Sequence, residues 1–187
     1  MASPENTTLK VANAKFYTAV VGTSRPNTVV LEKAPPVAWV NVGNTSLDNI
    51  MSLTSEGGAV STLASLQNKS LRQSVEPRIE SLNINLLDWT KESLKLYYGK
   101  NATVLADGAV EIPSEPVPSE LAFFAVLEDG IDITTFYCEK ASIFRADDIA
   151  IADTNSMAQL PLKVTALNAT GKTSAMTVTP PHNVSTP

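Results

Sequence analysis

The stretch from Arg72 to Leu86 constrains the fold more than any other part of the chain. In its second half apolar and polar residues alternate, the apolar ones being Leu82, Ile84 and Leu86 and the polar ones Ser81, Asn83 and Asn85. This period of two predicts a strand that buries one face and exposes the other. A core strand of a mainly β fold is therefore expected here.

The first half of the same stretch is extended in character but has little to bury. As one strand, residues 72–86 would span roughly 50 Å at about 3.3 Å per residue, about the full width of a domain of this size. Pro77 is tolerated at a strand edge or a bulge. Backbone N–H and C=O groups need partners, and no partner for this polar half is evident in the chain. We therefore expect a hairpin arm over residues 60–85 that pairs with another copy, the alternative being a solvated surface hairpin.

Charges of both signs line this arm and are the candidate contacts with a neighbouring subunit or ring. They are Lys69, Arg72, Glu76, Arg78 and Glu80. Closure of strand edges between identical subunits around a ring would remove the hazard of a long exposed edge.

The remaining elements are mostly strands. Strands are predicted at 14–23, 37–43, 102–113, 121–128, 132–145, 161–169 and 173–180, with a further β-branched run, VVLEK, at 29–33. Residues 46–60 are ambiguous, and we expect a loop with a short strand. Asp107-Gly108 and Asp129-Gly130 are hairpin turn signals.

One helix is predicted, at 89–99, with Thr90 as N-cap and Gly99 at its end. Seven or so strands and one helix favour an antiparallel two-sheet β-sandwich or a barrel. We expect one domain over 14–179, preceded by an N-terminal arm (1–13) and followed by a C-terminal tail (180–187).

Composition and motifs argue against an enzyme. The net charge of the 187 residues is −5, which disfavours nucleic-acid binding through a basic patch. The first ten residues lack an apolar h-region, so no secretory signal is expected. His182 lies in the expected tail, where a general base would lack a fixed geometry, and Cys138 is expected to be a buried small hydrophobe. No catalytic, cofactor-binding or metal-ligating pattern is present, so we expect no enzymatic activity, no cofactor and no metal.

The order of these segments resembles a known family. The run LASLQNKSLRQSVEPRIESLNINLLDWTKESLKLYYG (63–99) is similar to the central region of major tail proteins, or tail tube proteins, of long non-contractile-tailed bacteriophages (siphoviruses). FYTAVVGTSRPNT, AWVNVGNTS and the later LAFFAVLEDG–TTFYCEKASIFRADDIAIAD are similar to the same family. The likeness covers about residues 14 to 170 and is closest to phages of actinobacteria.

The resemblance implies a fold and a function. It implies a β-sandwich with one flanking helix and a long hairpin loop, six subunits joining their inner sheets into a β-barrel ring, and rings stacking into a tube. The implied partners are other copies of the chain, the tape-measure protein, tail-tip and tail-terminator proteins, and phage DNA that passes without specific binding. The protein would be made in the host cytoplasm, without a membrane, and reside in the virion tail.

The resemblance also assigns faces to residues. Ser81, Asn83 and Asn85 are expected to face the lumen. The luminal face of 132–145 stays open: if its odd positions are luminal, Glu139 and Arg145 are exposed while Phe136, Cys138 and Phe144 are buried. Amides and an acidic balance would suit a DNA conduit, because cations would hold phosphates through counterion release.

A second hypothesis is a monomeric β-sandwich binding module for carbohydrate or a protein partner. Carbohydrate sites commonly present exposed aromatic rings. The two tryptophans, Trp39 and Trp89, are more easily placed in the interior, at a strand and at a helix start.

Overall fold

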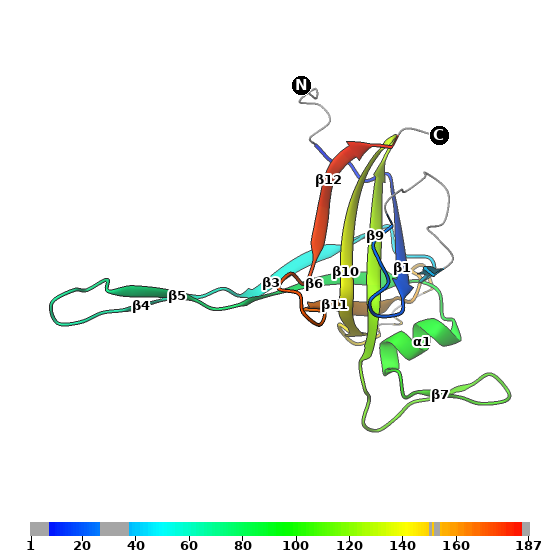
Figure 1. Cartoon of the computed structure of the whole chain (residues 1–187). Helices are drawn as coiled ribbons and strands as arrows, with labels where there is room; N and C mark the ends of the chain where they lie inside the picture. The colour runs from blue at the N-terminus through cyan, green and yellow to red at the C-terminus, as the bar shows by residue number, and fades with distance from the viewer. Residues whose placement is uncertain (1–7, 27–37, 150, 152–153, 185–187) are drawn as a thin grey trace.

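The computed structural model describes residues 8–26, 38–149, 151 and 154–184. The VVLEK run and the outer parts of both expected terminal arms (1–7 and 185–187) lie outside these residues. The described chain is built mainly from antiparallel strands, as expected, and has one α-helix (Figure 1).

Eight strands form one continuous sheet. They are β1 (Asn13–Ala19), β2 (Val40–Asn41), β3 (Ser52–Gly57), β6 (Arg78–Leu86), β9 (Ser119–Asp129), β10 (Asp132–Arg145), β11 (Leu160–Leu167) and β12 (Thr177–Asn183). The strand order is β2-β1-β9-β10-β11-β6-β3, and β12 pairs with β10. Two small hairpins, β4 (Val60–Leu63) with β5 (Arg72–Val75) and β7 (Thr103–Val104) with β8 (Val110–Glu111), lie outside it.

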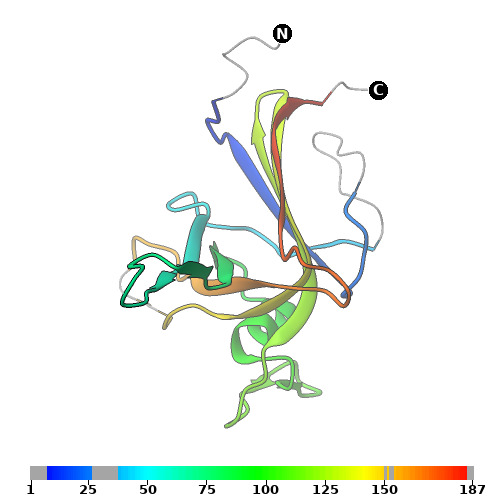
Figure 2. The same ribbon diagram turned by 60° about the vertical axis from the view of Figure 1, so that its left-hand side comes forward.

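The fourteen-residue strand β10 joins two halves of the sheet. The first half contains β2, β1, β9 and β12, and the second half contains β11, β6 and β3. Strand β9 pairs with β10 on both sides of a bulge, β12 pairs with its first part, and β11 pairs with its last part. The sheet bends along β10, so that β11 and β6 lie across β1, β9 and β12 (Figure 2). The pairing therefore gives one bent sheet, whereas the sequence predicted two separate sheets, because a single long strand belongs to both layers.

A β-bulge marks the bend in β10. Cys138 lies opposite Phe123 of β9, but Ala141 lies opposite Leu121, so β10 carries one extra residue. A bulge shifts the alternation of side chains by one residue. Cys138 and Ala141 both point into the core, and beyond the bulge Ile143 is the buried residue.

The sequence left the faces of residues 132–145 open, and neither simple alternation holds along the whole strand, because the bulge exchanges the two sides. Phe144 is only half-buried, because the bulge moves it to the opposite face of the sheet, and the guanidinium of Arg145 lies 5.9 Å from the centre of its ring. Phe136 is also half-buried, although it packs against the core.

The main core lies between the two halves of the sheet. Phe16 and Phe123 from β1 and β9 meet the alternating residues Leu82, Ile84 and Leu86 of β6 in this cluster. The period of two therefore predicted the buried face of β6 correctly. A second cluster, on the other side of the first half-sheet, packs Trp39 against Phe124 and Tyr137.

Helix α1 (Lys91–Tyr98) covers one side of the main core. Thr90 caps it by accepting a hydrogen bond from the Ser93 N–H, and Gly99 ends it with a positive φ of 109°. The Tyr97 side chain is buried, and its hydroxyl donates a 2.7 Å hydrogen bond to the Asp147 carbonyl. Both predicted helix-end residues are confirmed.

Two boundaries differ from the sequence prediction. Residues 180–183, expected in a tail, continue β12, with His182 opposite Ile133 of β10. In the strand-like segment 102–113, only Thr103–Val104 and Val110–Glu111 are strands, and they form the short β7–β8 hairpin around the predicted Asp107-Gly108 turn. The Asp129-Gly130 turn connects β9 to β10 as predicted.

Candidate functional site: a polar sheet face and a projecting arm

The second half of the sheet has one apolar and one polar face. Directly opposed residues of antiparallel strands point to the same side, and Asn83 of β6 lies between Ser52 of β3 and Lys163 of β11. Extending this register defines what we call the polar face. Its polar residues are Ser52, Thr54, Ser81, Asn83, Asn85, Lys140, Ser142, Lys163 and Thr165, and four less polar residues, Ile79, Phe144, Pro161 and Leu167, share the same side.

The residues expected to face a lumen fall on this side of the sheet. Asn83 and Asn85 are half-buried on the polar face. Ser81 shares the face but is only 1% exposed, because its short side chain lies between Thr54 and Thr165 of the adjacent strands. Its hydroxyl is 3.4 Å from that of Thr165. Ser81 therefore lies on the polar face but is covered by the neighbouring side chains and does not reach its outer surface.

Glu139 lies at the bulge of β10. Because Cys138 and Ala141 both point into the core, Glu139 and Lys140 are both left on the side away from it. Glu139 is half-buried and accepts a hydrogen bond from the Lys172 ammonium. The bulge thus adds two adjacent charged residues beside the polar face.

Three ion pairs connect the strands on this side of the molecule. Lys163 Nζ lies 3.1 Å from Glu56 Oε1 and reaches across β6 to β3. Lys140 Nζ lies 3.2 Å from Glu120 Oε2 of β9, and the third pair is Lys172–Glu139. The sequence prediction missed Glu56 because the 46–60 segment has no clear alternation. The outward position of Lys163 could have been found from the alternation in LPLKVTAL.

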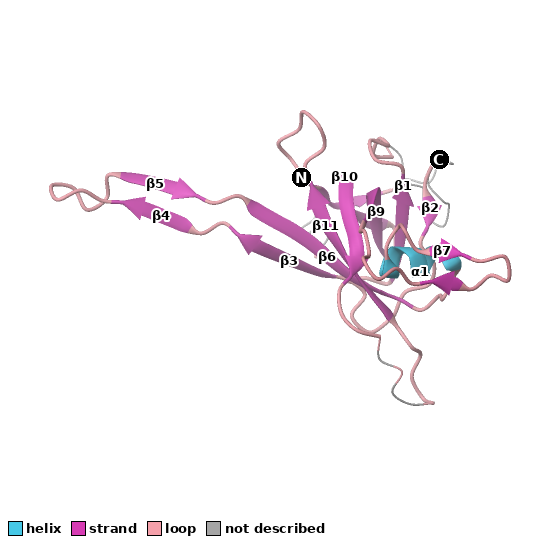
Figure 3. Cartoon of the chain, turned by 90° about the horizontal axis from the view of Figure 1, so that it is seen from below, coloured by secondary structure: helices cyan, strands magenta, loops and turns pink. Residues whose placement is uncertain are grey.

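The arm, residues 58–77, projects far from the rest of the molecule (Figures 1 and 3). Its strands β4 and β5 pair with each other, and β3 and β6 pair at its root. The expectation that its polar half lacks a partner within the chain is therefore wrong: residues 52–63, where the sequence pattern was ambiguous, supply one. The outer edges of the arm pair with no other described strand.

The charged residues predicted for the arm are spread along it. Lys69, Arg72, Glu76 and Arg78 are exposed, and Glu80, at the root, accepts a 2.8 Å hydrogen bond from the Ser55 hydroxyl. The arm also exposes large apolar side chains, of which Leu66 at the tip is 100% exposed. The others are Val60, Leu63, Leu71 and Val75. Exposed apolar groups gathered on one projection are typical of an interaction surface.

A joint separates the arm from the sheet. Gly57 and Gly58 both have positive φ, 82° and 74°, which side chains other than that of glycine rarely permit. A Cβ at Gly57 would lie 2.5 Å from the carbonyl oxygen of Pro77 on the opposite strand. Pro77 has no N–H to donate, so the ladder of hydrogen bonds is interrupted here.

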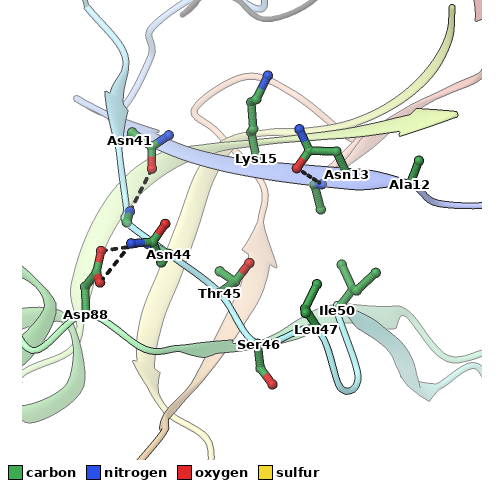
Figure 4. A pocket seen from close by; sticks show the side chains of 12 residues that line it. Ala12, Asn13, Lys15, Asn41, Asn44, Thr45, Ser46, Leu47, Ile50 and Asp88 are labelled. Atoms are coloured by element: carbon green, nitrogen blue, oxygen red, sulfur yellow. Dashed lines mark hydrogen bonds between the residues drawn. The ribbon is translucent and has the colours of Figure 1, made fainter. Parts of the chain in front are cut away.

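A polar pocket of about 450 Å³ lies beside β1 and the 43–50 loop (Figure 4). The Asp88 carboxylate accepts hydrogen bonds from the Asn44 backbone N–H (2.8 Å) and side-chain amide (3.1 Å). Lys15 is paired with Glu128 at 2.8 Å. These polar groups thus bond to one another, and no aromatic ring lines the pocket.

The tryptophans give little support to a carbohydrate platform. Trp39 is buried as expected, whereas Trp89 is 43% exposed and its Nε1 donates a 3.4 Å hydrogen bond to the Ala158 carbonyl. Trp89 is a single exposed ring outside the pocket.

Cys138 and His182 contribute no evident reactive centre. Burial raises the pKa of the Cys138 thiol to about 12, so the reactive thiolate is disfavoured. His182 is exposed on β12. In the described ranges, no cluster of three or more His, Cys, Asp or Glu residues suited to a metal ion is found.

Comparison with known proteins identifies the family. A family model described as phage tail tube protein matches residues 1–185. The chain belongs to the phage tail tube protein family. It is 28% identical to the major tail protein Gp23 of Mycobacterium phage L5 over 178 residues, which cover 90% of this chain and 88% of the relative. Identity to the major tail protein Gp23 of Mycobacterium phage D29 is 29% with the same coverage.

Family membership supports a structural role in the phage tail, and the resemblance to tail proteins of actinobacterial phages is confirmed. A tail tube protein is expected to assemble with copies of itself and with other tail proteins. Within the described residues, no helix is long and apolar enough to span a bilayer.

Proposed function

We propose that this chain assembles into hexameric rings that stack into the phage tail tube, the conduit for genome delivery. The number six comes from the family resemblance. Joined sheets of neighbouring subunits would close the ring as a β-barrel, since β2 and β3 are the two ends of the strand order within each subunit. The tape-measure protein would occupy the lumen during assembly, and the tail-tip and terminator proteins would complete the two ends.

The observation that carries this proposal is the arm. It is a two-stranded ribbon that exposes both leucines and charges, and an isolated hairpin is marginally stable in water. A second copy of the chain would cover these groups. The arm would contact the next ring through its leucines and through Lys69, Arg72, Glu76, Arg78 and Glu80.

The polar face is the surface that we assign to the lumen. Asn83, Asn85 and Glu139 would be presented to the DNA, with Ser81 beneath them. Amides and paired charges give phosphates little to hold, so a duplex would slide along this surface. A conduit of this kind needs no catalytic group, and we propose no enzymatic activity.

Replacing the arm tests the proposal. Glu56 and Ile79 face each other across β3 and β6, so residues 57–78 can be replaced by Asn-Gly, which favours a two-residue hairpin turn. The shortened chain should keep its thermal unfolding midpoint, because the arm contributes no residue to either core. Electron micrographs should show tubes for the full chain and none for the shortened one.

A matched control keeps the arm and changes surface charge elsewhere. The variant K100Q/E111Q removes one exposed charge of each sign outside the arm and should still form tubes. Tubes formed by the shortened chain would show that the arm is not the connector.

A further inference from the structure

The lysines of the polar face are each held by a glutamate. Among the described residues four ion pairs are present, and three of them lie on or beside this face. They are Lys163–Glu56, Lys140–Glu120 and Lys172–Glu139. Both lysines that lie on strands of the polar face, Lys140 and Lys163, are paired in this way.

Stability alone explains these pairs poorly. The side chains of Glu120, Glu56 and Lys172 are between 49% and 65% exposed, and ion pairs with exposed partners contribute little to folding. Charge is the more sensitive property of this surface. An unpaired lysine beside a duplex displaces a condensed counterion when it contacts a phosphate, and each such contact strengthens binding.

We infer that Glu56, Glu120 and Glu139 mask the three lysines on or beside the polar face and so weaken the binding of DNA to it. Each lysine ties two segments together: β11 to β3, β10 to β9, and the 168–176 loop to β10. Each glutamate carboxylate neutralises the positive charge that its lysine would otherwise present to a phosphate. The biological use of the masking rests on the proposed function, because it matters where DNA passes along this face.

The test replaces the three glutamates by glutamine and keeps the three lysines. The variant E56Q/E120Q/E139Q raises the formal net charge from −5 to −2, since three negative charges are lost. The control variant E92Q/E111Q/E115Q makes the same change at exposed carboxylates of α1, β8 and the following loop, away from the polar face. Binding of a fluorescently labelled duplex of mixed sequence is followed by anisotropy at increasing salt.

The unmasked variant should bind the duplex, and the wild type and control should bind it weakly or not at all. Three new phosphate contacts would make the slope of log K against log salt more negative by about 2.7, which corresponds to about a 40-fold loss of affinity between 50 and 200 mM salt. Equal binding by the unmasked and control variants would overturn the inference.

A second variant identifies the cations responsible. Adding K140Q, K163Q and K172Q to the three glutamine substitutions returns the formal net charge to −5. DNA binding should then fall to the wild-type level, while circular dichroism confirms that the chain remains folded. Binding that persists would place the contacts elsewhere and exclude masking.

Electron microscopy of the same samples separates this inference from the proposed function. If the wild type forms tubes and the unmasked and control variants bind DNA equally, the masking inference is refuted and the tube proposal stands. If the wild type forms no tubes and only the unmasked variant binds DNA, the tube proposal is refuted and the masking inference stands.

Discussion

At the residue scale, the buried tyrosine hydroxyls and the Cys138 thiol make the stability of the fold depend on pH in alkaline solution. Burial raises the pKa of Cys138 from 9.0 to about 12, and burial also raises the pKa values of Tyr17, Tyr97 and Tyr137 above their ordinary value of 10.0. In each case the unfolded chain loses its proton at a lower pH than the folded chain. The contribution of these four groups to stability is therefore full below pH 9 and is lost as the pH rises through their folded-state pKa values.

We expect the free energy of unfolding, measured in urea, to decrease steadily above pH 9. The variant C138A should show a shallower decrease between pH 9 and about 12, by up to about 1.4 kcal/mol per pH unit. An identical pH dependence in both proteins would mean that Cys138 ionises as easily in the folded state as in the unfolded one.

Single residues also show which contacts a sequence pattern can and cannot predict. The burial of Leu82, Ile84 and Leu86 follows from a local alternation, and Thr90 and Gly99 follow from local helix-end chemistry. The side of the sheet on which Phe144 lies does not follow from the sequence, because the bulge before it depends on pairing with β9. The burial of Ser81 likewise depends on Thr54 and Thr165, which come from strands distant in the sequence.

At the scale of elements, the joint at the root of the arm separates two bodies. Gly57→Ala should disrupt it, because the added Cβ would lie 2.5 Å from a backbone oxygen at a positive φ. Such a strained position costs about 1–3 kcal/mol. Hydrogen exchange should increase in β3 and in the first residues of β6 and remain unchanged in β9 and β10.

The control for this prediction is Gly22→Ala. Gly22 also has a positive φ, 87°, but nothing lies within 4 Å of an added Cβ. It should therefore report the cost of the backbone conformation without the collision. Equal effects of the two substitutions on exchange in β3 would show that the close approach to Pro77 is unimportant.

The arm also shows why an element can be predicted without its partner. Residues 72–86 indicate an extended segment, but residues 46–60 contain two glycines and show no clear alternation, so their pairing with it was not predictable from periodicity. The register of β3 against β6 places Glu56 near Lys163. For this reason the ion pairs of the polar face became visible only in the structure.

At the scale of the whole molecule, the assignment of the polar face to a lumen predicts the behaviour of a phage. Exchanging Asn83 and Asn85 for lysine adds two unpaired cations to the face without touching the core. Tails should assemble normally, as seen by electron microscopy, and DNA ejection should be slower because the added cations contact phosphates. Ejection can be timed with a DNA-binding dye.

A phage that carries lysine at Thr103 and Asn183 is the control, since both residues are exposed on other strands, β7 and β12. It should eject DNA at the normal rate. Normal ejection by the phage with lysine at Asn83 and Asn85 would refute the assignment of this face to the lumen.

The bulge in β10 has a consequence for how such chains can change over generations. Removing one residue between Cys138 and Ala141 would restore simple alternation against β9, so Ala141 and Ile143 would still point into the core and only one charged residue would remain between them on the other side. A residue gained or lost in the 64–71 tip of the arm alters neither core. Descendants of this chain can therefore vary in length at the tip without altering either core, whereas a descendant that loses the bulge residue keeps its core but gives up either Glu139 or Lys140 and the ion pair that this residue makes.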